Sequence, residues 1–201
     1  MKEYYYDKLM NIHTQGSKMD INNSIVYHPY EPTPYSALEV LFKHYEVKMT
    51  DNIVDFGCGK GRLNFYINYS FNAVCTGIEM NETFFNQAIQ NQNSYFRKFK
   101  KHKGLIQFLN CYAEDYVIQP KDNRFYFFNP FSVQIFIKVV NNILLSVEQS
   151  KREIDLILYY ASDDYQHFLE TNTLFNLYKE ITLPGHYEKD SYERFLIYRL
   201  A

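Results

Sequence analysis

Three glycines at alternate positions follow a short apolar run, and an acid stands two residues before the first of them. The segment reads Ile53-Val-Asp-Phe-Gly-Cys-Gly-Lys-Gly61, with Asp55 ahead of Gly57. Glycine lets the backbone turn tightly and approach a ligand closely, and the following helix then points its N-terminus at that ligand. A dinucleotide fingerprint needs its third glycine at position 62, which is Arg62. The spacing therefore predicts a loop for another ligand, and Asp55 suits an ammonium group better than a pyrophosphate.

This loop resembles that of the class I S-adenosylmethionine (SAM) methyltransferases, whose pattern is Gly-x-Gly-x-Gly with an acid two residues upstream. The resemblance covers about residues 30 to 200. It implies that SAM is the cofactor and that Asp55 and the backbone of Gly57 and Gly59 face its methionine part. Glu79 ends the next β-rich run and resembles the acid with which this family binds both ribose hydroxyls. Met80 would then lie against the adenine. The alternative for Glu79 is a solvent-facing acid at a helix start.

The third β-rich run leads into Asn110-Cys-Tyr-Ala-Glu-Asp-Tyr116, which resembles the family's adenine-contacting loop. That loop usually has an acid followed by alanine, and here Tyr112 occupies the position of the acid. The resemblance implies cofactor contacts from Ala113 and Glu114. The alternative is that Glu114 and Asp115 only cap a turn.

Upstream, Tyr30-Glu-Pro-Thr33 resembles the extended segment that covers the methionine end of SAM in several nitrogen-directed methyltransferases, which implies contacts from Tyr30 and Thr33. The order of EPTPY, a helix, VDFGCGKGR, a strand and an acid is also similar to that of uncharacterised bacterial methyltransferases related to the Rossmann-type histone lysine methyltransferases.

After the fourth β-rich run comes Asn129-Pro130-Phe131, where class I enzymes handle the methyl acceptor. It resembles the Asn-Pro-Pro-aromatic motif of methyltransferases that act on planar amino groups, although the second proline is missing and Phe131 stands one place early. The resemblance implies that carbonyls of Asn129 and Pro130 accept the amino hydrogens and that Phe131 stacks on the acceptor. The alternative is that Asn129 only bonds backbone at a strand end.

Other candidates have simpler explanations. His186 could act as a base, but a lone loop histidine is more often solvated. Asp163 and Asp164 suit a helix start, and the basic run Arg97–Lys103 suits a helix end on the edge of the sheet away from the cofactor. The six histidines show no metal-ligand spacing, so we expect no metal site.

The elements that would position these residues alternate between β-rich and helical patterns. Strands are expected near 53–55, 73–79, 105–109, 124–128 and 154–160, and helices near 34–46, 61–70, 82–100, 132–149 and 163–171. Two further strand-like runs, 175–183 and 193–200, have no helix between them. This pattern predicts an α/β protein with the class I methyltransferase Rossmann-like fold: a mostly parallel seven-stranded sheet, a C-terminal antiparallel hairpin and helices on both faces.

Composition sets the remaining bounds. With 201 residues and 46% apolar content, one core is expected, as residues 34–201, preceded by a polar lid or substrate-side segment, 1–33. The net charge of -2 argues against non-specific nucleic-acid binding but does not exclude a nucleic-acid substrate. Three cysteines without C-x-x-C spacing, and no long apolar run, favour a cytoplasmic protein that does not enter the membrane.

The sequence therefore predicts a SAM-dependent methyltransferase that acts on a nitrogen of an unidentified protein or small-molecule acceptor. The loops of the expected catalytic edge are mixed in charge rather than basic, which places methylation of an adenine amino group in nucleic acid second. A SAM-binding sensor or interaction protein without catalysis is the other alternative. Arg62 and Asp55 disfavour a nicotinamide oxidoreductase.

Overall fold

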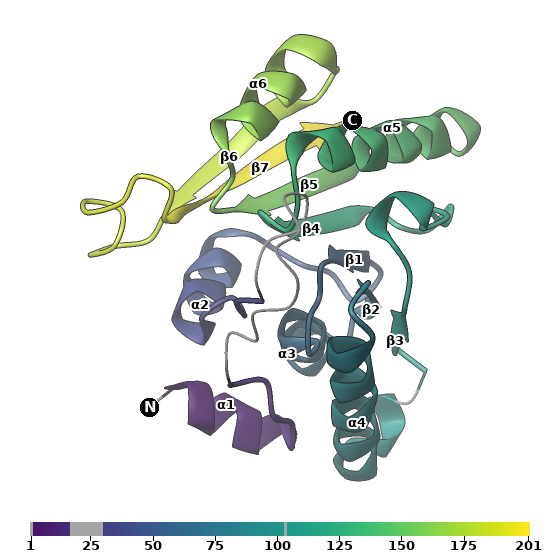
Figure 1. Cartoon of the computed structure of the whole chain (residues 1–201), viewed down its shortest axis with the longest axis vertical. Coiled ribbons are helices and arrows are strands. Elements are labelled where there is room, and N and C mark those ends of the chain that lie inside the picture. The colour runs from purple at the N-terminus through teal and green to yellow at the C-terminus, as the bar shows by residue number, and fades with distance from the viewer. Residues whose placement is uncertain (1, 17–29, 103) are drawn as a thin grey trace.

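The centre of the fold is a seven-stranded sheet. The computed structural model describes residues 2–16, 30–102 and 104–201. Its strands are β1 (Asn52–Phe56), β2 (Val74–Ile78), β3 (Ile106–Leu109), β4 (Arg124–Phe128), β5 (Ile154–Tyr159), β6 (Asn176–Thr182) and β7 (Arg194–Leu200). They lie in the order β3-β2-β1-β4-β5-β7-β6 (Figure 1). β1 to β5 pair in parallel, and β7 is antiparallel to both β5 and β6, so the expected hairpin is confirmed.

Helices cover both faces of this sheet, which confirms the expected Rossmann-like architecture. They are α1 (Lys2–Met10), α2 (Tyr35–His44), α3 (Arg62–Phe71), α4 (Glu82–Lys98), α5 (Val133–Gln149) and α6 (Asp163–Asn172), with short 3-10 helices η1 (Lys100–His102) and η2 (Ala113–Asp115). Figure 1 shows α5 and α6 on one side of the sheet and α1 to α4 on the other.

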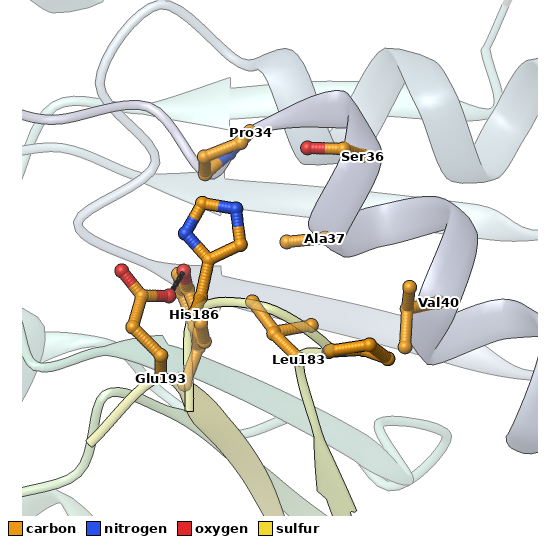
Figure 2. A pocket seen from close by; sticks show the side chains of 9 residues that line it. Pro34, Ser36, Ala37, Val40, Leu183, His186 and Glu193 are labelled. Atoms are coloured by element: carbon orange, nitrogen blue, oxygen red, sulfur yellow. Dashed lines mark hydrogen bonds between the residues drawn. The ribbon is translucent and has the colours of Figure 1, made fainter. Parts of the chain in front are cut away.

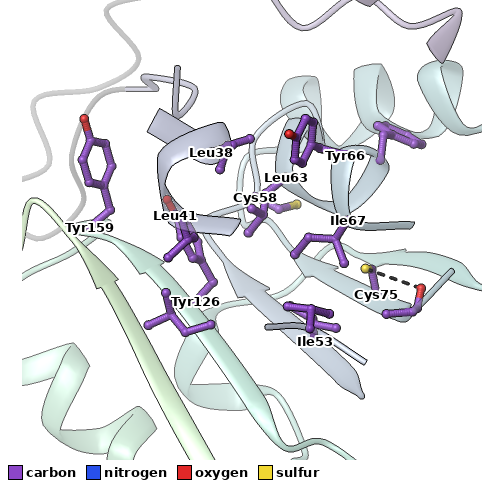
Figure 3. Packing of buried hydrophobic residues seen from close by; sticks show 14 of the residues in the cluster. Leu38, Leu41, Ile53, Cys58, Leu63, Tyr66, Ile67, Cys75, Tyr126 and Tyr159 are labelled. Carbon is purple, nitrogen blue, oxygen red and sulfur yellow. Dashed lines mark hydrogen bonds between the residues drawn. The ribbon is translucent and has the colours of Figure 1, made fainter. Parts of the chain in front are cut away.

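Alternate residues of each strand face the two helical layers, as the two-residue period of a strand requires. Ile53, Tyr126 and Ile157 lie in the core beneath α2, α3 and α4, part of which Figure 3 shows. Val54 and Phe125 belong to the second core, beneath α5 and α6. Because strands in the middle of a doubly covered sheet are buried on both faces, they read as continuous apolar runs.

The N-terminal region differs from the expectation. Residues 2–10 form a helix that the sequence pattern did not predict, and Met10 and Ile12 are buried in the core. Pro34 is the N-cap of α2. The hydroxyl of Thr33, which precedes it, bonds the Tyr126 hydroxyl at 2.8 Å. The part of the expected lid at 17–29 lies outside the described residues.

The fold brings the loops of interest to one edge of the sheet. The parallel strands end there, and the loop between β6 and β7 returns to the same edge, because β7 runs antiparallel to β5. The basic run lies at the opposite edge, around the end of α4 and η1, with Lys103 outside the described residues. Within the described chain, no helix is both long and apolar enough to span a bilayer.

Candidate functional site

The glycine loop connects β1 to α3 and adopts a conformation that ordinary residues avoid. Gly57 and Gly59 have φ values of 79° and 54°, in the left-handed region. A Cβ atom at Gly57 would lie 2.8 Å from Cβ of Pro130, and one at Gly59 would lie 2.1 Å from a ring carbon of Tyr30. Two of the expected site segments therefore touch this loop directly. A larger residue at Gly57 or Gly59 would displace Pro130 or Tyr30.

Asp55 lies at the end of β1 and is 4% exposed. Burial, and then the nearby charge of Glu79, raises the pKa of the Asp55 carboxyl to about 8. A buried carboxylate is costly unless a cation or hydrogen-bond donors compensate its charge. The ionised form of Asp55 is therefore favoured when a cationic group lies beside it.

Glu79, just beyond β2, is held in a different way. One carboxylate oxygen accepts the Gly59 N–H at 2.9 Å and the other accepts the Asn81 N–H at 2.8 Å. Burial raises the pKa of Glu79, while these backbone donors and the N–H of Met80 oppose that shift. Each oxygen retains a lone pair, so the fixed carboxylate can also accept hydrogen bonds from a ligand.

Exposed apolar side chains gather where β2 and β3 end. Met80 and Leu109 are each 38% exposed, and Tyr112 is 51% exposed. The side-chain amide of Asn110 donates to the backbone oxygens of Glu79, at 2.8 Å, and Met80, at 3.1 Å, and so ties the two strand ends together. Met80, Leu109 and Tyr112 therefore form an exposed apolar corner of the molecule, on strand ends that Asn110 holds together. Sequence reasoning missed Asn110, since its partners come from another strand.

The expected adenine-loop residues follow in η2. Ala113 is buried in the core beneath α5 and α6. Glu114 lies against α5: its carboxylate is 4.0 Å from the Lys138 ammonium, and its backbone oxygen accepts from the Asn142 amide at 2.9 Å. The cofactor contacts expected of Ala113 and Glu114 stay predictions.

Asn129 and Pro130 follow β4 at the same edge as the glycine loop. Asn129 has φ 38°, a left-handed conformation that asparagine tolerates better than most residues, and Pro130 lies over Gly57. Phe131 requires a correction. Its ring is 1% exposed and lies in the core near the ring of Phe127, and its backbone oxygen accepts from the Tyr165 hydroxyl. A ring so buried has no face for an acceptor.

The Tyr30 ring lies beside the glycine loop, and Thr33 lies beside the start of α3, where its backbone oxygen accepts from Arg62 at 3.2 Å. The Tyr30 ring packs against Gly59 and against Phe84, with ring centroids 4.6 Å apart, and its hydroxyl donates to the Thr14 backbone oxygen at 2.8 Å. Thr33 is fixed through its bond to Tyr126. Contact of either residue with a cofactor stays a prediction.

Residues 2–16 are anchored by a buried polar network. The Asp7 carboxylate accepts from the backbone and hydroxyl of Thr14, at 2.7 and 2.8 Å, and from the Tyr35 hydroxyl at 2.7 Å. Arg62 donates to the Thr14 hydroxyl at 2.8 Å and forms an ion pair with Glu3. Arg62, which displaces the third glycine of a dinucleotide fingerprint, therefore holds the N-terminal segment against the glycine loop.

The remaining expected positions are surface features. Asp163 and Asp164 begin α6, as predicted, and the N-cap of this helix is Ser162. His186 lies in the loop between β6 and β7 and lines a cavity of about 160 Å³ beside α2 (Figure 2). Sequence reasoning missed this cavity, because its walls come from distant parts of the chain. The residues described contain no cluster of side chains that could hold a metal.

Comparison with known proteins gives the fold a context. No family model and no curated protein matches the sequence. An RNA methyltransferase from Salinibacter ruber, solved with S-adenosylhomocysteine (SAH), is 16% identical with a TM-score of 0.55, over 84% of this chain and 92% of that one. A SAM-dependent methyltransferase from Thiobacillus denitrificans, also solved with SAH, is 13% identical with a TM-score of 0.53, over 85% and 92%.

A protein from Pyrococcus horikoshii named as a predicted RNA methyltransferase is 14% identical with a TM-score of 0.59, over 98% of this chain and 96% of its own. At such low identities these similarities establish the fold, which nearly the whole chain shares.

Proposed function

We propose that this protein is a SAM-dependent methyltransferase that transfers the methyl group to a nitrogen of a protein or small-molecule acceptor. One observation carries the proposal: two buried carboxyl groups, Asp55 and Glu79, flank a glycine loop at the carboxyl edge of a parallel sheet. The similar folds solved with SAH support the same ligand.

The chemistry of the residues fits SAM. The ammonium group of the methionine part would favour the ionised form of the Asp55 carboxyl, whose pKa burial raises to about 8. Glu79 is fixed at the end of β2, with a free lone pair on each oxygen for the ribose hydroxyls. The apolar corner of Met80, Leu109 and Tyr112 gives an adenine ring a surface to cover.

SAM supplies a methyl group already activated by its sulfonium, so the protein has to align the acceptor and exclude water. Asn129 and Pro130 stand next to the glycine loop, where their carbonyl oxygens can accept hydrogens from an acceptor nitrogen and direct its lone pair. Tyr30 closes the loop on its other side and limits the access of water. Without a role for Phe131, acceptor packing must come from other residues.

Methylation of RNA is the second candidate, favoured by the Salinibacter and Pyrococcus proteins of similar fold. The charges at this edge argue the other way, because Asp190 and Glu193 stand there beside Lys189, so the edge is mixed in charge, whereas RNA, a polyanion, is bound best by a basic surface. A non-catalytic SAM sensor would need the same Asp55 and Glu79, and retention of Asn129-Pro130 favours an enzyme over a sensor.

Incubation of the protein with methyl-labelled SAM and fractionated cell extract tests the proposal. Label in protein or small-molecule fractions, dependent on Asn129, supports it. Label in RNA alone would move the assignment to the second candidate. Absence of label from every fraction, with SAM bound, would favour the sensor.

A further inference from the structure

The cavity beside α2 lies next to the site that should handle the acceptor. Tyr159 ends β5, and its ring centroid is 4.5 Å from that of Phe128, the residue directly before Asn129. Pro34 lines the cavity and follows Thr33, which bonds Tyr126 of β4. Two residues of β4, Phe128 and Tyr126, therefore contact Tyr159 of the cavity lining and Thr33 beside it.

One wall of the cavity is aliphatic. It is formed by Pro34, Ala37 and Val40 of the α2 region and by Leu183 and Pro184 after β6. Figure 2 shows the side chains of Ala37, Val40 and Leu183 close together on this side. Such a wall stabilises an unbranched hydrocarbon stem by removing it from water.

The other wall carries negative charge. The Glu193 carboxylate accepts a 2.5 Å hydrogen bond from the Tyr159 hydroxyl, and Figure 2 shows the His186 ring beside it. Asp190 belongs to the same loop but is not among the lining residues, and its carboxylate accepts from the Tyr160 hydroxyl at 2.6 Å. Among the described residues that line the cavity there is no lysine or arginine.

The basic residue nearest to Glu193 in sequence forms an ion pair with another acid. Arg194, next to Glu193, pairs with Glu180 at 2.8 Å. After accepting from Tyr159, the Glu193 carboxylate still has lone pairs for a further donor. A partly exposed carboxylate at the rim of an aliphatic cavity suits a cationic group on an apolar stem.

We propose that this cavity binds the methyl acceptor as an aliphatic amine, with its stem against Ala37, Val40 and Leu183 and its nitrogen near Glu193. This inference rests on the proposed function. In the transfer, the ammonium first loses a proton to solvent. The nitrogen lone pair then forms the N–C bond, and the C–S bond breaks with its electron pair left on sulfur. The positive charge passes to nitrogen, where Glu193 also stabilises the product.

Titration of the full-length chain with n-butylamine, followed by NMR at the His186 ring, tests the cavity. 1-Butanol, of equal length but neutral, is the matched probe. We expect saturable shifts with butylamine and binding at least several-fold weaker with butanol. Glu193→Gln should weaken butylamine binding about tenfold, the scale of one partly exposed charged contact, while Glu188→Gln in the same loop should not change it.

A second variant covers the case in which Glu193→Gln disturbs the fold. Val40→Phe should fill the cavity from α2 and abolish the butylamine shifts. Equal binding of butylamine and butanol, no binding of either probe, or full butylamine affinity in Val40→Phe would overturn the proposal. Binding of a short single-stranded RNA that shifts the same His186 signals, without butylamine binding, would assign the cavity to nucleic acid.

Two further arms complete the experiment. If acetyl-lysine methylamide binds at least as tightly as butylamine, the acceptor is a lysine side chain of a protein. If it does not bind, the acceptor is a free amine. Calorimetry with SAM on the same samples separates the two levels of inference. No SAM binding would refute the proposed function, whereas SAM binding without amine binding would refute only the assignment of the cavity.

Discussion

The carboxyl group of Asp55 should change its charge when a cationic ligand arrives. Its raised pKa of about 8 means that it is protonated at neutral pH without a ligand, and an ammonium group beside it would favour the ionised form. Binding of SAH near pH 7 should therefore release a proton. Affinity should rise by up to about tenfold between about pH 6 and pH 7, and fall again above about pH 8 as the ligand's amino group is neutralised.

Calorimetry in two buffers with different ionisation enthalpies measures this proton release. Asp55→Asn, which keeps the shape of the side chain and cannot ionise, should bind more weakly and show no difference between the buffers. A wild-type protein without proton release would argue that Asp55 does not meet the ammonium group.

Glu79 should contribute directly to affinity for SAM. Loss of a charged acceptor for two ribose hydroxyls costs roughly 1.5–3 kcal/mol, so Glu79→Ala should weaken binding by about one to two orders of magnitude. The same change removes the acceptors of the Gly59 and Asn81 N–H groups. Glu79→Gln keeps one acceptor oxygen and should lie between wild type and Glu79→Ala. Unchanged affinity in the folded Ala variant would remove Glu79 from the site.

Asn129 should affect the rate of transfer more than cofactor binding. It follows β4, whereas the cofactor contacts are expected from β1, β2 and β3, so Asn129→Ala should retain SAM affinity within a few-fold. If its carbonyl orients the acceptor, the transfer rate should fall by about two orders of magnitude, the scale of one oriented polar contact. This prediction is tested by measuring the transfer rate with the identified acceptor and the SAM affinity of the same variant. Normal transfer would leave Asn129 as a strand-end residue.

At the scale of single residues, the sequence predicts what local spacing determines. Asp55 lies in β1, Gly57 and Glu79 directly follow β1 and β2, and the three residues are close together in the structure. Phe131 was misplaced because a motif does not show which way a ring points after an unusual backbone angle at Asn129. Glu193 was missed because its partner, Tyr159, is distant in sequence.

Among the elements, the loop between β6 and β7 is expected to respond to ligand, since it borders the cavity and the edge where SAM should bind. Lys189 is exposed in this loop and offers a trypsin site. Saturating SAH should slow cleavage after Lys189 several-fold by closing the loop. Cleavage after Lys43, exposed in α2, is a control for protease activity in the same digest. Identical rates at Lys189 with and without SAH would argue against a lid there.

The N-terminal helix shows what pattern reading misses at the scale of elements. A nine-residue helix is marginal alone, and α1 buries only Asp7 and Met10 along its length. Its position depends on contacts of Asp7 with Thr14 and Tyr35 and on the ion pair of Glu3 with Arg62, which no periodicity reveals. α5, with its continuous apolar stripe, was predicted to within one residue of its observed limits.

For the molecule as a whole, alternation of strands and helices was sufficient to predict a parallel sheet, and the missing helix before β7 was sufficient to predict the terminal hairpin. Similarity in fold to methyltransferases extends over nearly the whole chain, yet fold alone does not determine function. The decisive property is therefore which ligand the glycine loop accepts.

Calorimetry of the full-length chain with SAM, SAH and NAD tests this most directly. SAM and SAH should each bind at one site per chain, because Asp55 receives the ammonium and Glu79 the ribose. NAD should not bind, because the buried Asp55 carboxyl offers a pyrophosphate no positive charge and Arg62 stands in place of the third glycine. Binding of NAD together with no binding of SAM or SAH would contradict the account.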